Sequence, residues 1–288
     1  MDHSLEIIYE PRHGRPVDMN IVFIHGLSGN SRSTWTHEDT STFWPEDMLP
    51  REFPYCRVLT YSYAADLMDF FPKAAARRKS IDDHSTDLIE ALNNFRAVPQ
   101  KAHEGIAFVA HSLGGLICAN ALTHDKADET NIRRYTSFIF FFATPFADPE
   151  CLDLWTDTVE NFYILCGMGN DDFENPNEQT TMARSVIKRF GEYIHSKPRS
   201  SIQLIFFAED DPIKNGNADG IKILEEDMAA PEGGHSVTIE GDHVSMCKLH
   251  YGSSGCRVFF GHLSQIKRPA FSEYMVATVR VRERPGWM

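Results

Sequence analysis

The chain has 288 residues, enough for one large α/β domain with a substantial core. Lys plus Arg (28) against Asp plus Glu (41) gives a formal net charge of −13, which repels phosphate backbones, so we expect no nucleic-acid partner. The first residues are acidic and no apolar window is long enough to span a membrane, which predicts a cytoplasmic protein without a signal peptide or transmembrane segment. The six cysteines form no CxxC pair and are expected to be reduced thiols.

Apolar runs of strand length alternate along the chain with amphipathic helical patterns. In chain order, the predicted elements are strands at 5–9, 20–25 and 57–62, a helix at 81–96, a strand at 105–110, a helix at 113–123, a strand at 137–143, a helix around 183–194, and strands at 202–208 and 236–239. Several strands are apolar throughout, so we expect helices on both faces of the sheet. The pattern predicts a single domain over residues 1–288, α/β in class, with a doubly wound, mainly parallel sheet and a lid or insertion around residues 146–200.

Ser112 stands where such a sheet places its ligand sites, just beyond the carboxyl end of a strand. It follows an apolar strand and precedes a helix, in the segment AHSLGG of residues 110–115. A serine that attacks a carbonyl must project from a sharp strand-to-helix turn, and small neighbours prevent clashes there. The pattern therefore predicts that Ser112 is a nucleophile, although Ala110 stands where glycine is usual. The alternative is a serine that only caps the helix.

Two backbone N–H groups are expected to hold the oxyanion that such an attack creates. One is the N–H of Leu113, directly after the serine and at the start of a helix. The other is the N–H of Leu27, in the glycine-bearing loop that follows strand 20–25. The neighbouring residues His25, Gly26 and His111 are predicted to lie at the substrate pocket.

His243 is the predicted general base. Hydrolases with this kind of elbow present their residues in the chain order serine, acid, histidine. His243 lies in a loop after the last short strand, which leaves its imidazole free to reach Ser112. His235 precedes that strand and His250 falls in a helix-like segment, so neither is favoured.

The acid of the triad stays open between Glu209 and Asp211, which both follow strand 202–208. Glu209 is the first residue beyond the strand, whereas Asp211 precedes a proline, as the acid of many hydrolases does. Asp148 is a third choice, after strand 137–143. Whichever residue serves would hold the imidazole tautomer and stabilise the imidazolium.

Four segments together carry a resemblance to a known family. They are IVFIHGL at 21–27, FVAHSLGG at 108–115, ATP at 143–145 and GDHVSMCK at 241–248. Over about residues 18–260 the chain resembles the lipase-like serine esterases of the α/β-hydrolase superfamily, the serine-active-site-containing family, and especially its fungal members.

The resemblance implies an α/β-hydrolase fold, with Ser112 as nucleophile and His243 as base, and it favours Glu209 as the acid. One departure from the family concerns the pocket. Where members often have histidine after Gly-Thr-Pro, this chain has Phe146, which we expect to make that wall more apolar.

The first functional hypothesis is an esterase or lipase-like serine hydrolase that acts on a small-molecule or lipid-like acyl substrate through an acyl-enzyme. A second uses the same residues in a biosynthetic thioesterase, acyltransferase or cyclase. A third is a non-catalytic binding module on the hydrolase fold. No cofactor or metal is predicted, since the sequence has no HExxH motif and no Cys/His cluster of ligand spacing.

Overall fold

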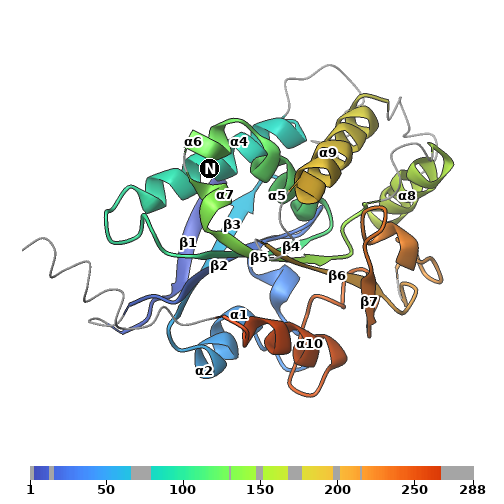
Figure 1. Ribbon diagram of the computed structural model, residues 1–288. Helices are drawn as coiled ribbons and strands as arrows, with labels where there is room; N and C mark the ends of the chain where they lie inside the picture. The colour runs from blue at the N-terminus through green and yellow to red at the C-terminus, as the bar shows by residue number, and fades with distance from the viewer. Residues whose placement is uncertain are drawn as a thin grey trace, which may run out of the picture.

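The computed structural model describes residues 3–12, 16–65, 79–129, 131–146, 152–167, 177–196, 202–214 and 216–266. These residues form a seven-stranded sheet in the order β1-β3-β2-β4-β5-β6-β7 (Figure 1). Strand β1 pairs antiparallel with β3, and the other neighbours are parallel. The strands are β1 (His3–Tyr9), β2 (Met19–Ile24), β3 (Cys56–Tyr63), β4 (Ile106–His111), β5 (Thr136–Phe142), β6 (Gln203–Glu209) and β7 (Ser236–Ile239).

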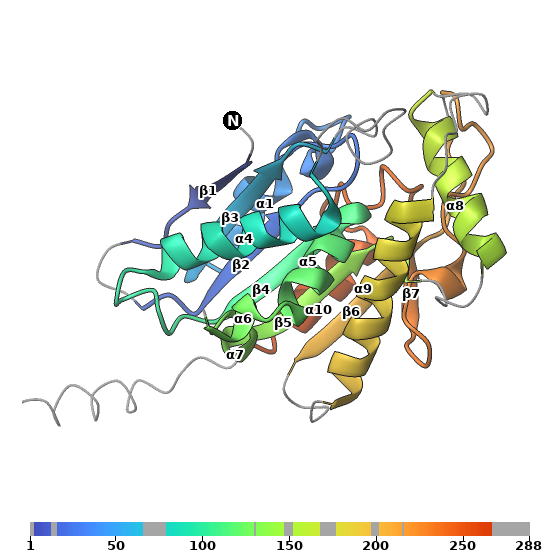
Figure 2. The same ribbon diagram turned by 90° about the horizontal axis from the view of Figure 1, so that it is seen from above.

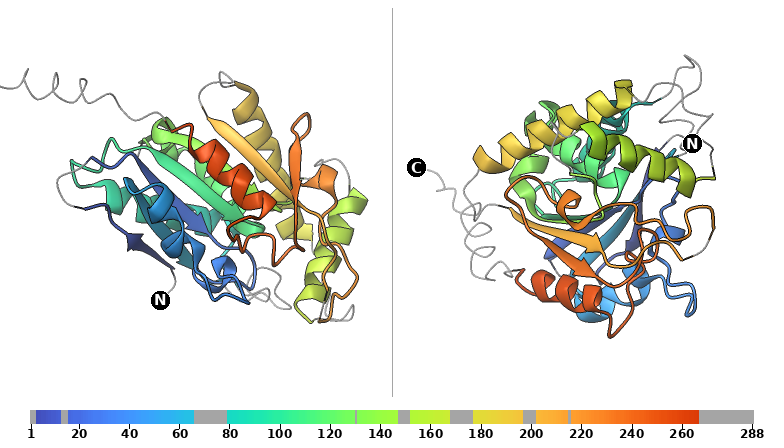
Figure 3. Two further views of the ribbon diagram at one scale, coloured as in Figure 1. Left: turned by 90° about the horizontal axis from the view of Figure 1, so that it is seen from below. Right: turned by 90° about the vertical axis from the view of Figure 1, so that its right-hand side faces the viewer.

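Helices cover both faces of the sheet (Figure 1). One face carries α4 (Ile81–Arg96), α5 (Leu113–Thr123), α6 (Lys126–Glu129), α7 (Ile132–Tyr135) and α9 (Asn177–Ser196), and the other α1 (Trp44–Asp47), α2 (Leu49–Glu52) and α10 (Ser254–Leu263). Helix α8 (Leu152–Leu165) stands beside these layers, near β6 and β7 (Figure 2 and Figure 3). Two short 3-10 helices, Ser33–Trp35 and Glu226–Met228, lie in the loops.

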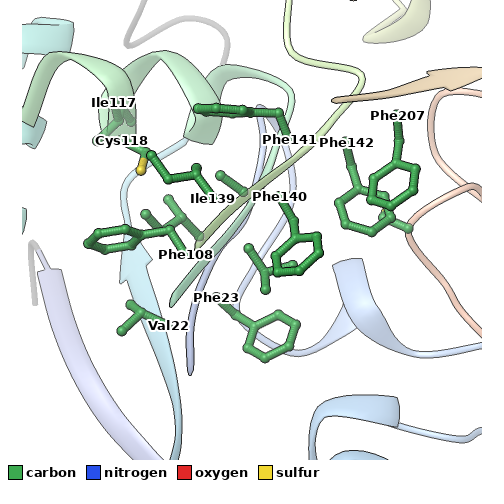
Figure 4. Packing of buried hydrophobic residues seen from close by; sticks show 14 of the residues in the cluster. Val22, Phe23, Phe108, Ile117, Cys118, Ile139, Phe140, Phe141, Phe142 and Phe207 are labelled. Carbon is green, nitrogen blue, oxygen red and sulfur yellow. The ribbon is translucent and has the colours of Figure 1, made fainter. Parts of the chain in front are cut away.

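The burial of the strands explains the layered arrangement. Every residue of β2 and β4 is buried, as expected of parallel strands covered on both faces. The core is rich in phenylalanine and isoleucine, and Figure 4 shows Phe108, Phe140, Phe142 and Phe207 packed among aliphatic side chains. The rings of Phe142 and Phe207 lie 4.5 Å apart and so tie β5 to β6. This close-packed centre gives the loops at the strand ends a rigid base.

The predicted fold class is confirmed, with the one antiparallel strand at the edge. The helices at 81–96 and 113–123 and the strand at 236–239 match residue for residue. Within the stretch 146–200, α9 packs against α5 in the helical layer, so it is not part of a lid. In the part of the chain that the structure describes, no helix is both long and apolar enough to cross a membrane. None of the described cysteines is in a disulfide, and Cys151 lies outside the described residues.

Candidate active site

Ser112 lies at a sharp turn between the end of β4 and the start of α5. Its backbone has φ 52° and ψ −125°, a left-handed conformation that costs a non-glycine residue about 1–3 kcal/mol. Two hydrogen bonds hold this turn: the Ser112 N–H donates to the Phe142 carbonyl at 2.9 Å, and the Gly115 N–H donates to the Ser112 carbonyl at 2.9 Å. The strain is therefore built into the junction between strand and helix.

The glycines around Ser112 stand where the structure has no room for a side chain. A Cβ at Gly114 would collide with the carbonyl oxygens of Ile24 and His25, and one at Gly115 would collide with Thr144. Because backbone atoms cannot move aside easily, α5 can approach β2 this closely only with glycine at 114. Ala110, where glycine is usual, is fully buried, so the fold accommodates its methyl group.

The loop after β2 passes directly beside the serine. A Cβ at Gly26 would lie 2.8 Å from the Ser112 Cβ and 2.7 Å from the His111 Nδ1. The Ser28 N–H donates to the Ala65 carbonyl at 2.7 Å and fixes the loop. Among the described residues, the N–H groups of Leu27 and Leu113 have no acceptor, as an oxyanion hole requires.

His243 and Glu209 form a buried pair at the ends of the last two strands. Their side chains are 2% and 0% exposed, and the His243 Nδ1 lies 3.0 Å from the Glu209 Oε2. The other carboxylate oxygen, Oε1, accepts the N–H of Leu224 at 2.8 Å. With both carboxylate oxygens engaged, the Glu209 side chain has one orientation and fixes that of the imidazole ring.

Two further polar atoms of the site have no hydrogen-bond partner within the described residues. They are the Oγ of Ser112 and the Nε2 of His243, and both are buried. Both residues line the same pocket. A buried hydroxyl and a buried ring nitrogen left unpaired require an explanation, and a catalytic role is one that fits two such atoms in one pocket.

The structure brings Glu209 and not Asp211 to His243, which separates the two acids that the sequence left open. The Asp211 side chain is 37% exposed and pairs with Lys214 at 2.9 Å. That hydrogen bond lowers the pKa of the Asp211 carboxyl. The backbone N–H of Asp211 donates to the Gly241 carbonyl, so the residue belongs to the turn after β6. Asp148 lies outside the described residues.

His111 connects the Ser112 turn to the loop that carries His243. Its Nε2 lies 2.8 Å from the carbonyl oxygen of His243, to which it donates as the neutral ring. Burial first, and then the charge of His243, lower the pKa of His111 to about 3. The ring is therefore uncharged at neutral pH and acts as a fixed donor between β4 and the loop after β7.

His25 and Gly26 support the site from behind, contrary to the expectation that they line the pocket. The His25 ring stacks on Tyr63 at 4.4 Å, and its Nδ1 lies 3.0 Å from the Gly26 carbonyl. Burial lowers the pKa of His25 to about 4. Neither residue is among those that line the pocket, whereas His111 and Leu27 are.

Phe146 also lies elsewhere than predicted. It is 1% exposed and packs edge-on to Phe141 at 4.8 Å and face-on to Phe190 of α9 at 5.6 Å. The aromatic side chains of β5 and α9 thus draw Phe146 into the core. It is absent from the pocket lining, so it sets no wall of the pocket.

The pocket at Ser112 has a volume of about 290 Å³. Helix α8 contributes one part of its wall that the sequence pattern did not predict. The ring of Phe162 meets the His243 ring edge-on at 5.2 Å and shields it from solvent. The described residues that line the pocket are Leu27, Ser28, Gly29, Ser33, Thr34, His111, Ser112, Phe162, Leu165, Cys166, His243, Val244, Cys247 and Lys248.

An Asx turn shapes the loop that carries His243. The Asp242 Oδ1 accepts the N–H of Ser245 at 2.8 Å, the N–H of Val244 at 3.1 Å and the Ser245 hydroxyl at 2.7 Å. Gly241, before it, has φ 111°, and a Cβ there would press on the Met246 backbone. In the described residues, no group of three or more His, Cys, Asp or Glu side chains is placed to hold a metal ion.

Comparison with known structures identifies the class of fold. A Bacillus licheniformis lipase, BlEst2, aligns with a TM-score of 0.56 at 18% identity, over 91% of this chain and 98% of its own. A Listeria innocua protein aligns with a TM-score of 0.51 at 14% identity, over 86% of this chain and 95% of its own. The chain has the α/β-hydrolase fold, and Ser112 lies at the turn between β4 and α5.

Sequence comparison gives a more particular similarity. Residues 18–147 match the family model described as "Putative serine esterase (DUF676)", which covers less than half of the chain. Over 254 residues the chain is 24% identical to Protein SERAC1 of Bos taurus and 21% identical to that of Homo sapiens. Each match covers 82% of this chain but 37% of the relative. The chain thus spans little more than a third of these relatives, which are vertebrate; the fungal affinity stays a prediction.

Proposed function

We propose that this chain is a serine hydrolase that cleaves carboxylic esters, with Ser112 as nucleophile, His243 as general base and Glu209 as the acid. One observation carries the proposal: the two buried unpaired atoms, the Ser112 Oγ and the His243 Nε2, belong to one pocket, while Glu209 holds the opposite nitrogen of His243. The names of the family model and of the lipase neighbour support esters as the substrate class.

The reaction follows from these positions. The Ser112 Oγ attacks the ester carbonyl as its proton passes to the His243 Nε2, and the carbonyl oxygen becomes an oxyanion. The N–H groups of Leu27 and Leu113 donate to that oxyanion. When the C–O bond to the alcohol breaks, His243 returns the proton to the leaving oxygen, and an acyl-serine remains.

Water completes the cycle. His243 takes a proton from the water molecule that attacks the acyl-serine, then gives it to the Ser112 Oγ as the acid leaves. Glu209 keeps the Nδ1 of His243 protonated and faces the imidazolium with a negative charge at each step. No metal takes part in this scheme, since His243 generates both nucleophiles.

A fluorophosphonate probe tests the proposal, because it labels only an activated serine. Wild-type protein should be labelled and should hydrolyse short nitrophenyl esters, and Ser112→Ala should lose both properties. Ser264→Ala is the matched control, since Ser264 is exposed and bonds the Gly261 carbonyl after α10. Labelling that persists in Ser112→Ala, or wild-type protein that is never labelled, would overturn the assignment. Acyl thioesters assayed in parallel separate an esterase from a thioesterase.

A further inference from the structure

Lys248 lines the pocket at Ser112 and also a second pocket, which its ion-pair partner Glu38 lines as well. Among the described residues that line the pocket at Ser112, Lys248 alone carries a permanent charge. The Lys248 side chain is only 10% exposed. The chain as a whole carries a net charge of −13. Lysine is almost never buried to this degree without partners, so its position needs an explanation.

The ammonium group of Lys248 is incompletely paired. Its one acceptor within the described part of the chain is the Glu38 carboxylate, which is 78% exposed. An ammonium has three N–H donors, so two remain for another acceptor. An ion pair with one partner this exposed contributes little, since water and salt compete for the carboxylate. Glu38 can therefore be displaced at little cost.

The position of Lys248 also bears on the chemistry. His243 must become an imidazolium during the reaction, and a nearby ammonium makes a second positive charge harder to form. The charge of Lys248 is felt at the site, because after burial and the charges of His243 and His25 it makes the smallest contribution to lowering the pKa of His111.

We propose that Lys248 binds an anionic group of the substrate, a carboxylate or a phosphate, which replaces Glu38 as its partner. The proposal rests on the ester hydrolysis proposed above and makes the substrate class an ester with a negative charge close to the scissile bond. The free enzyme keeps Lys248 neutralised by Glu38. In the complex the substrate anion takes over that role.

Two pairs of matched esters test the inference. One pair has the charge on the acyl side, mono-4-nitrophenyl glutarate against 4-nitrophenyl pentanoate; the other has it on the alcohol side, 4-butyryloxybenzoate against its methyl ester. Wild-type enzyme should have the higher kcat/KM for the anionic ester in at least one pair. In Lys248→Met that preference should fall about tenfold or more, the usual effect of a lost charged hydrogen bond. Lys248→Arg should restore it, and Glu38→Gln should increase it.

A binding measurement separates failure of this inference from failure of the proposed function. Glutarate and inorganic phosphate are titrated calorimetrically into Ser112→Ala and into Ser112→Ala/Lys248→Met, and circular dichroism confirms that both are folded. The dissociation constant of at least one anion should rise about fivefold or more in the double variant. Equal affinities, or a Lys248→Met effect that is the same for the charged and neutral esters, would overturn the anion site even in an active esterase. If Lys248→Met weakens anion binding but the wild-type protein hydrolyses no ester, the anion site stands and the ester chemistry is overturned instead.

Discussion

The two sides of the candidate site are held in place by different interactions. On the serine side, residues 26–29 and 110–115 are held by backbone hydrogen bonds together with close approaches that only glycine allows, because a Cβ at Gly26 or Gly114 would collide with its neighbours. On the histidine side, Glu209 and residues 240–248 are positioned by hydrogen bonds to carboxylates, carbonyls and N–H groups.

The difference predicts how each side responds to change. Steric placement is independent of protonation but tolerates no added atom, because protein interiors are close-packed. Placement by hydrogen bonds tolerates small changes of shape, but it depends on each donor and each tautomer. Substitutions that remove one kind of interaction and leave the other intact therefore test the comparison.

The largest effect is expected for Glu209→Gln. The variant keeps the shape of the side chain, but its amide can donate to the His243 Nδ1 and so favours the wrong tautomer. We expect kcat to fall by about 10³–10⁴, with thermal stability reduced much less. Asp211→Asn is the matched control, because Asp211 is exposed and pairs with Lys214. Hydrolysis of a nitrophenyl ester is measured for both variants. Equal losses of kcat in Glu209→Gln and Asp211→Asn would contradict the assignment of Glu209 as the acid.

A smaller but still large effect is expected for Gly26→Ala. The new Cβ would lie 2.8 Å from the Ser112 Cβ, so the loop must shift and carry the Leu27 N–H away from the oxyanion. We expect a loss of about 10²-fold in kcat and of about 1–3 kcal/mol in the free energy of unfolding.

Gly191→Ala is the control for Gly26→Ala. Nothing lies within 4 Å of a Cβ at this position in α9, so the helix should gain up to about 1 kcal/mol and activity should not change. Urea unfolding and ester kinetics on both variants make the comparison. A fully active Gly26→Ala would show that the loop has more freedom than its contacts allow.

The sequence predicts the serine side better than the histidine side, because the serine side depends on consecutive residues and the histidine side on contacts between distant ones. The elbow is a local pattern, in which an apolar strand, a serine and small residues are consecutive at 106–115. The choice of acid depends on how the chain turns after β6: Glu209 ends the strand facing His243, and the N–H of Asp211 bonds the Gly241 carbonyl. That turn depends on a contact about 30 residues away, which no local pattern contains.

The pocket walls were the least predictable part. Phe162 meets His243 across 81 positions of the chain, and only the packing of α8 shows that it does. Phe146 follows a strand and is apolar, so its sequence context is the same for a pocket residue and for a core residue. The aromatic side chains of Phe141 and Phe190 decide for the core.

The smallest effect concerns His111, the contact that joins the two sides. His111→Phe keeps a planar ring beside Gly26 but removes the donor to the His243 carbonyl, whereas an amide in His111→Gln can still donate. Loss of one neutral hydrogen bond predicts a fall of about tenfold or less in kcat for His111→Phe, largely recovered in His111→Gln. Equal losses in the two variants would show that ring packing, rather than the hydrogen bond, positions the base.

Acid stability provides an independent readout of the same residue. The pKa of His111 is lowered by burial from 6.5 to about 3 in the folded protein, so between these values the unfolded chain binds a proton that the folded chain does not. Its contribution to stability is therefore complete above pH 6.5 and is lost as the pH falls toward 3. Urea unfolding at pH 7.5 and pH 5 should show a smaller acid-induced loss in His111→Phe than in wild type. If the acid-induced loss of stability is the same in His111→Phe and in wild type, His111 is protonated in the folded state. That result would contradict a buried neutral ring that donates to the His243 carbonyl and leaves its other nitrogen unprotonated.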